Sequence, residues 1–241
     1  MAWAVSIAAF VVSKLAYILL EDIPSVLANF TTIRSFLVQV RMGQVLLFQF
    51  VIAVSLIMLS HLVKSRNGFR VMFGLVAVGI VPSSLTGHSG NTSWHELAVG
   101  SWAVHIVSVS IWSALVGALL YLAIFTPSDI RLNIGIVSKV SLPCFFIVTA
   151  SGVVNAGVRM PSLESVFTST YGKILIAKIL VFIIVGVIAG YYRARIIPND
   201  LTTSNIFYRL LMIEVLLMCV AIMLGVVLSE TKFPIVRVVP N

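Results

Sequence analysis

The sequence has 241 residues, of which 60% are apolar and only 10% are charged. Ordinary soluble domains carry about 25% charged residues, so this composition excludes a water-soluble globular protein. The formal net charge of +8 does not indicate a nucleic-acid partner, because the Lys and Arg residues lie between apolar blocks, where they act as topology determinants.

The apolar residues form blocks near twenty residues long, the length that an α-helix needs to cross a hydrocarbon core about 30 Å thick. A β-barrel is excluded because its strands alternate in polarity over about ten residues. We therefore predict an all-α polytopic transmembrane helix bundle that forms a single membrane domain over residues 1–241. Its spans, about seven in number, are predicted at residues 1–20, 43–63, 69–85, 93–125, 137–156, 172–192 and 205–228.

Basic residues gather in three of the connections between these spans. The three clusters are Lys64, Arg66 and Arg70; Arg131 and Lys139; and Arg193, Arg195 and Arg209. The positive-inside rule places such clusters in the cytoplasm, which predicts that the N-terminus lies inside and the C-terminus outside.

A weak internal repeat relates residues 13–48 to residues 151–182. Each segment reads as a helix, an outer loop and a second helix, with Pro-Ser and a Phe-Thr pair in the loop. Both loops run in the same direction relative to the membrane, so the pattern predicts a parallel duplication of the kind found in many transporters. Similar apolar composition is the alternative explanation.

Three histidines fall near the predicted outer face. His88 follows the third span between two glycines, which allow a tight turn and a close approach of backbone to a ligand. Ser93 and Glu96 form a capping box that places His95 in the first turn of the fourth helix. At 100° per residue, His95, Trp102, His105 and Trp112 fall within about a 100° sector of that helix. This stripe is predicted to face a partner helix or an aqueous cavity; purely structural histidines are the alternative.

The helix geometry limits how these histidines cooperate. Ten residues at 1.5 Å each separate His95 from His105 by about 15 Å, so the two cannot hold one ion together. His88 could pair with either of them, or the three could serve as successive stations on an inward path.

Sulfur ligands and intramembrane charges form two further groups. The sulfur candidates, which favour soft ions such as Cu(I) but are also common packing residues, are Cys144, Met218, Cys219 and Met223. Glu214 is a carboxyl group predicted near mid-membrane, where such groups are rare and often functional. Lys178 and Lys14 are candidate counter-ions; a neutral Glu214 that only donates a hydrogen bond is the alternative.

Several separated motifs resemble the copper resistance D (CopD) domain over residues of about 69–198. They are Leu85-Thr86-Gly87-His88, the spacing of His105 and Trp112, Ser151-Gly152-Val153-Val154-Asn155, Tyr171-Gly172-Lys173, Lys178, and Tyr192-Arg193-Ala194-Arg195 before Pro198. The resemblance implies a multi-pass protein of a prokaryotic inner (plasma) membrane that handles copper beside a soluble CopC-type copper carrier. It points to His88 and His105, whereas His95 comes from the stripe alone.

We therefore predict a non-enzymatic protein that binds copper at its outer face through His88 with His95 or His105, and passes it across or into the membrane. No G-x-x-x-x-G-K-[ST] motif occurs, so transport is expected to be passive or driven by an ion gradient. Two alternatives remain: a b-type haem redox protein with histidine axial ligands, and a non-catalytic subunit or assembly factor that supplies copper to a membrane oxidase or monooxygenase complex.

Overall fold

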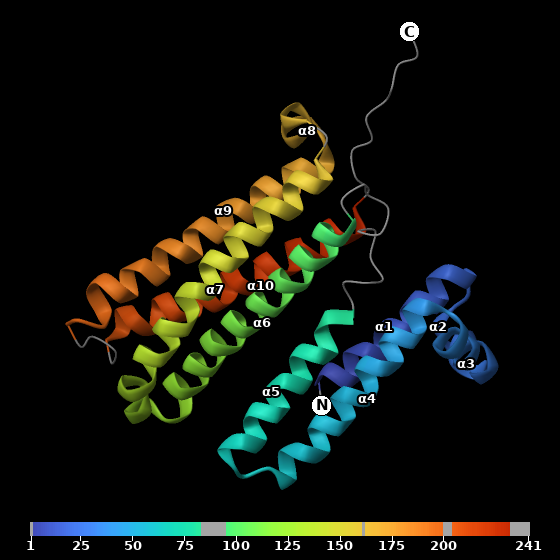
Figure 1. Cartoon of the computed structure of the whole chain (residues 1–241), viewed down its shortest axis with the longest axis horizontal. Helices are drawn as coiled ribbons and strands as arrows, with labels where there is room; N and C mark the ends of the chain where they lie inside the picture. Colours follow the sequence, from blue (N-terminus) through green and yellow to red (C-terminus); the bar gives the residue numbers. More distant parts are fainter. Residues whose placement is uncertain (1, 83–94, 161, 200–203, 232–241) are drawn as a thin grey trace. The chain divides into compact units, whose positions relative to one another are not determined.

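The computed structural model describes residues 2–82, 95–160, 162–199 and 204–231 (Figure 1). This part of the chain is built from helices and contains no strand. It divides into two compact units, Met1–His95 and Glu96–Asn241. The prediction of an all-α polytopic membrane bundle is confirmed.

The first unit is built around α4 (Arg41–Leu62), which packs against α1 (Ala2–Leu19), α3 (Phe30–Gln39) and α5 (Arg66–Ile80). A short helix, α2 (Ile23–Ala28), precedes α3. Apolar side chains such as Ile7, Leu15 and Leu46 form its core. A buried hydrogen bond also joins α4 to α5: the Gln49 side-chain amide donates to the Gly79 carbonyl at 2.9 Å.

The second unit consists of four long helices side by side: α6 (His95–Phe125), α7 (Ile130–Arg159), α9 (Thr170–Tyr191) and α10 (Asn205–Glu230) (Figure 1). A short 3-10 turn, η3 (Pro127–Asp129), joins α6 to α7, and a short helix, α8 (Leu163–Thr168), precedes α9. A π-helical turn, η4 (Tyr192–Ile196), extends α9. The fully buried side chains Ile130, Ile196, Phe207 and Leu211 show that the core lies between these helices.

Each of the seven predicted spans corresponds to one helix. Five helices are long and apolar enough to cross a membrane: α4, α6, α7, α9 with η4, and α10. The other two, α1 with 18 residues and α5 with 15, reach about 27 Å and 22 Å at 1.5 Å per residue. The predicted orientation of the chain stays a prediction.

Helix α7 begins at Ile130, seven residues before the predicted span. Its first turns carry Arg131, Asn133 and Lys139, which an apolar pattern leaves out. The backbone hydrogen bonds of a helix continue where its hydropathy falls, so the helix is longer than its apolar part. The capping residue Ser93 lies outside the described residues, and α6 is described from His95 onward.

The same corner occurs in both halves of the predicted repeat. A single extended residue, Val40 or Ser169, joins a short helix to the next long helix. The third residue of that long helix is Gly43 in one case and Gly172 in the other, and a Cβ atom there would overlap the backbone carbonyl of Phe36 or Val166. Only glycine allows so close an approach. This likeness supports the duplication, which stays a prediction.

Candidate functional site

His105 lies on α6 with its side chain 7% exposed and directed at α7. Its Nδ1 atom is 2.9 Å from the hydroxyl oxygen of Ser151. That hydroxyl is also 2.6 Å from the Ile147 carbonyl oxygen, to which it donates. Because a serine has only one hydroxyl proton, its oxygen accepts from Nδ1–H of the imidazole. The other ring nitrogen, Nε2, then carries a lone pair.

The Ser151 turn is held in place from α6 as well. Ser101, one helical turn before His105, donates to the Ser151 carbonyl at 3.0 Å. Gly152 lies against the imidazole, where a Cβ atom would be 3.7 Å from Cε1 of His105, an ordinary contact distance. Two hydrogen bonds thus tie this turn of α7 to α6. This arrangement fixes the position of the histidine ring, which also has a hydrogen bond to the Val148 backbone.

An aromatic side chain and a cation stack on one side of the His105 ring. Trp102 is stacked on His105 with ring centroids 5.9 Å apart and an interplanar angle of 7°. The guanidinium of Arg159 lies 5.3 Å from the Trp102 centroid, within the range of a cation–π interaction. Arg159 also donates to the side-chain oxygen of Asn155 at 3.1 Å. Part of the predicted stripe therefore faces the bundle interior.

Two cations act electrostatically on His105: Lys178 of α9 and Arg159 of α7. The Lys178 ammonium reaches α10, where it is 3.2 Å from the position that a Cβ atom on Gly225 would take. Glu214 precedes Gly225 by eleven residues, or about 16 Å along α10, and its neighbour is Tyr192. The structure therefore brings Lys178 to the histidine, whereas Glu214 lies at another level of the bundle. Lys14 belongs to the first unit.

The remaining predicted histidines are only partly described. His88 lies outside the described residues, as does the side chain of His95, whose backbone begins α6. Since α6 is continuous, the distance of about 15 Å between His95 and His105 holds. Among the described residues, no three or more His, Cys, Asp or Glu side chains could together hold a metal ion. The metal role of the three histidines stays a prediction.

The structure separates the sulfur candidates into two pairs. Cys144 and Met218 belong to the buried core cluster of the second unit. Cys219 is exposed, and so is Met223, with 67% of its surface accessible. Only the first pair lies where it could contribute to a path through the interior of this unit.

The sequence did not single out Ser151 and Ser101 as partners of His105. Ser151 is 46 residues from His105 along the chain. The available signal was the segment Ser151–Asn155, which carried the family resemblance. In the structure its first residue holds the imidazole, and its last contacts Arg159.

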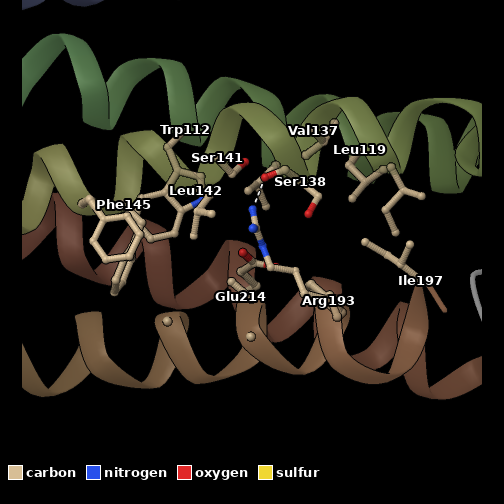
Figure 2. Close-up of a pocket in the computed structure, with 17 residues that line it drawn as sticks. Trp112, Leu119, Val137, Ser138, Ser141, Leu142, Phe145, Arg193, Ile197 and Glu214 are labelled. Carbon is tan, nitrogen blue, oxygen red and sulfur yellow. Dashed lines mark hydrogen bonds between the residues drawn. The ribbon is translucent and has the colours of Figure 1, made fainter.

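A second polar region lies about two turns of α6 away from His105. It is a cavity of about 140 Å³ lined by α6, α7, α9 with η4, and α10 (Figure 2). Glu214, 3% exposed, lines it together with Tyr192 and Arg193. Arg193 extends toward α7 and donates to the Ser138 carbonyl (Figure 2).

The fold and the site define a class: a multi-pass α-helical membrane protein whose helix bundle holds a buried, oriented histidine. Two protein-family models match the chain. "Copper resistance protein D-like, N-terminal domain" matches residues 1–96, and "Copper resistance protein D" matches residues 135–228. These matches of 96 and 94 residues cover 190 of the 241 residues. The chain belongs to the copper resistance protein D family.

The two matches correspond to the two structural units, since the first ends at residue 96 and the second unit begins at Glu96. Residues 97–134, which include His105, lie between the matches. No curated protein and no solved structure matches this chain. The protein is thus a copper resistance membrane protein whose apolar helices contact the lipid bilayer.

Proposed function

We propose that this protein binds copper at its outer face through His88 with His95 or His105 and passes it across or into the membrane. The observation that carries the proposal is His105 itself, a buried imidazole whose Nδ1 is held by Ser151 at 2.9 Å. Metal-binding histidines are commonly oriented in this way by a hydrogen bond to the second ring nitrogen. Imidazole is a good ligand for copper, and the chain belongs to a copper resistance family.

The charges beside His105 favour the monovalent ion. Arg159 and Lys178 both act on the imidazole and repel any cation that approaches it. Coulomb repulsion is proportional to the charge of the ion, so Cu(I) experiences half the repulsion of Cu(II). The two cations therefore disfavour Cu(II) at His105 more than Cu(I).

The proposed path runs from the outer face inward. His88, with His95 or His105, captures the ion, and the distance of about 15 Å from His95 to His105 makes these two separate stations. Cys144 and Met218 are weaker candidates for an inner continuation because both are buried in the second unit. The protein would act without catalysis in a prokaryotic plasma membrane, and a soluble CopC-type carrier is the proposed source of copper.

Copper uptake by proteoliposomes tests this function. We expect the His88→Ala/His105→Ala double variant to lose protein-dependent copper uptake, because both proposed capture ligands are gone. His61→Ala is the matched control, since His61 is an exposed histidine in the last turn of α4. Uptake by a well-folded double variant at the wild-type rate would overturn the proposal.

The same purified samples separate the two alternatives. Stoichiometric iron with a Soret absorption band would show a haem protein. Stable co-purification with an oxidase or monooxygenase complex, without copper flux in liposomes, would show a subunit or an assembly factor. Copper in the wild-type protein that is reduced in the His88→Ala variant would support the proposed ligand.

A further inference from the structure

Two of the helical segments that line the cavity around Glu214 depart from regular helical hydrogen bonding. Pro143 lies inside α7 and has no backbone N–H, so the carbonyl of Lys139 lacks its ordinary helical donor. Opposite, η4 is a π-turn in which Ile197 N–H donates to the Tyr192 carbonyl at 2.9 Å. Irregular backbone at membrane depth is tolerated where it lines a cavity, and π-turns are frequent at functional sites.

Two buried polar atoms of the residues that line this cavity have no hydrogen-bond partner among the described residues. Among the described residues, no hydrogen-bond partner is found for the indole N–H of Trp112 or the hydroxyl of Ser141, whereas the Tyr192 hydroxyl lies beside the Glu214 carboxyl group. Trp112, Ser141 and Tyr192 all line the cavity. A buried donor without a partner is destabilising, so these groups favour a polar neighbour.

Water fits this space. One water molecule needs a cavity volume of about 10–15 Å³ and two to four polar partners. The cavity volume of about 140 Å³ accommodates several molecules, and its mainly apolar lining includes the Glu214 carboxyl group and the side chains of Tyr192 and Ser141. Water in the cavity would lie beside the Glu214 carboxyl group, which lines it.

Glu214 has no cation within salt-bridge distance in the part of the chain that the structure describes, and its neighbour is Tyr192. Besides Glu214, the titratable residues that line the cavity are Tyr192 and Arg193, both from η4; α6 and α7 contribute none. A carboxylate without a salt bridge is costly inside a bilayer, and a bound proton removes that charge.

We infer that this cavity is a hydrated proton-binding site in which Glu214 is the proton acceptor and donor. On uptake, an O–H bond of a hydronium ion in the cavity breaks, and an O–H bond to a carboxylate oxygen of Glu214 forms, which leaves a neutral water molecule. Release reverses these steps. The site stands apart from the His105 site, because Trp112 follows His105 by seven residues, or about 10 Å along α6. If copper transfer occurs as proposed, this site offers a means of coupling it to a proton gradient.

Infrared difference spectroscopy between acidic and alkaline pH tests the site without copper. With the full-length protein in lipid nanodiscs, we expect a carboxylic C=O band at acidic pH that is lost in Glu214→Gln. The band should persist in Glu164→Gln, the matched control, since Glu164 is an exposed carboxylate on α8. Tyr192→Phe should shift the band because it changes the neighbour of the carboxyl group, and this variant serves if Glu214→Gln does not fold.

Two results would overturn the inference. One is a Glu214 band that stays unchanged from the acidic to the alkaline limit, which would mean a permanently neutral hydrogen-bond donor. The other is a titrating band that survives both Glu214→Gln and Tyr192→Phe without a shift. A His88→Ala/His105→Ala variant that loses copper uptake but keeps the band would support both proposals separately. Copper uptake by proteoliposomes tests the copper proposal, whereas the carboxylic C=O band of Glu214 tests the proton-binding site.

Discussion

Ser151→Ala is expected to weaken copper binding by the purified protein about 10- to 100-fold, the usual effect of removing a partner that orients a metal ligand. The serine hydroxyl accepts from Nδ1 of His105 at 2.9 Å and so keeps the lone pair on Nε2. Without it, the imidazole can rotate or change tautomer, and a buried Nδ1–H loses its partner. Competition with a copper chelator of known affinity measures the change.

Two control variants separate this role from a structural one. Ser151→Thr keeps the hydroxyl and should restore most of the affinity. Ser55 of α4 donates to the Val51 carbonyl at 2.8 Å, the same backbone bond that Ser151 makes to Ile147, so Ser55→Ala should leave copper binding unchanged. Equal affinities for Ser151→Ala and wild type, at equal thermal stability, would exclude Ser151 as the positioning residue.

Gly172→Ala is expected to lower the stability of the protein by about 1–3 kcal/mol or more, the cost of overpacking a close contact. A Cβ atom at this position would overlap the backbone carbonyl of Val166, and backbone cannot move aside as a flexible side chain can. The corner between α8 and α9 must therefore open. Thermal unfolding in detergent measures the loss, and Gly43→Ala should act in the same direction at the corner between α3 and α4.

Gly135→Ala is the matched control for this substitution. Gly135 lies within α7, and a Cβ atom there meets nothing within 4 Å. Alanine is favoured over glycine in a helix interior by about 1 kcal/mol, so this variant should be as stable as wild type or more stable. If Gly172→Ala unfolds at the same temperature as Gly135→Ala, the tight corner is not needed for the fold.

The helices were predictable because bilayer thickness sets a length that apolar blocks must match. Each of the seven predicted spans corresponds to a helix in the part of the chain that the structure describes. The predicted span began seven residues after the start of α7, because hydropathy identifies only the apolar part of a helix. The backbone hydrogen bonds of the helix extend into the polar residues before it. Helical periodicity also placed Trp102, His105 and Trp112 on one face, and the structure directs this face into the bundle, with Trp102 stacked on His105 and Trp112 buried.

The partners of these side chains were not predictable from spacing. The sequence marked Glu214 as costly and proposed Lys178 beside it, yet Lys178 lies near His105 and Gly225, while Tyr192 neighbours Glu214. Hydropathy places a residue at a depth in the membrane. It does not tell which way each helix is rotated toward its neighbours.

By itself, the sequence determined that the chain is a multi-pass helical membrane protein with copper-family motifs, a histidine inside a span and an intramembrane carboxyl group. These properties follow from composition, block length and the order of residues along one helix. Only the tertiary structure decided that Ser151 holds His105 and that Glu214 shares a cavity with Tyr192 and Arg193. Such contacts depend on the rotation and register of neighbouring helices, which close packing of side chains across several helices sets.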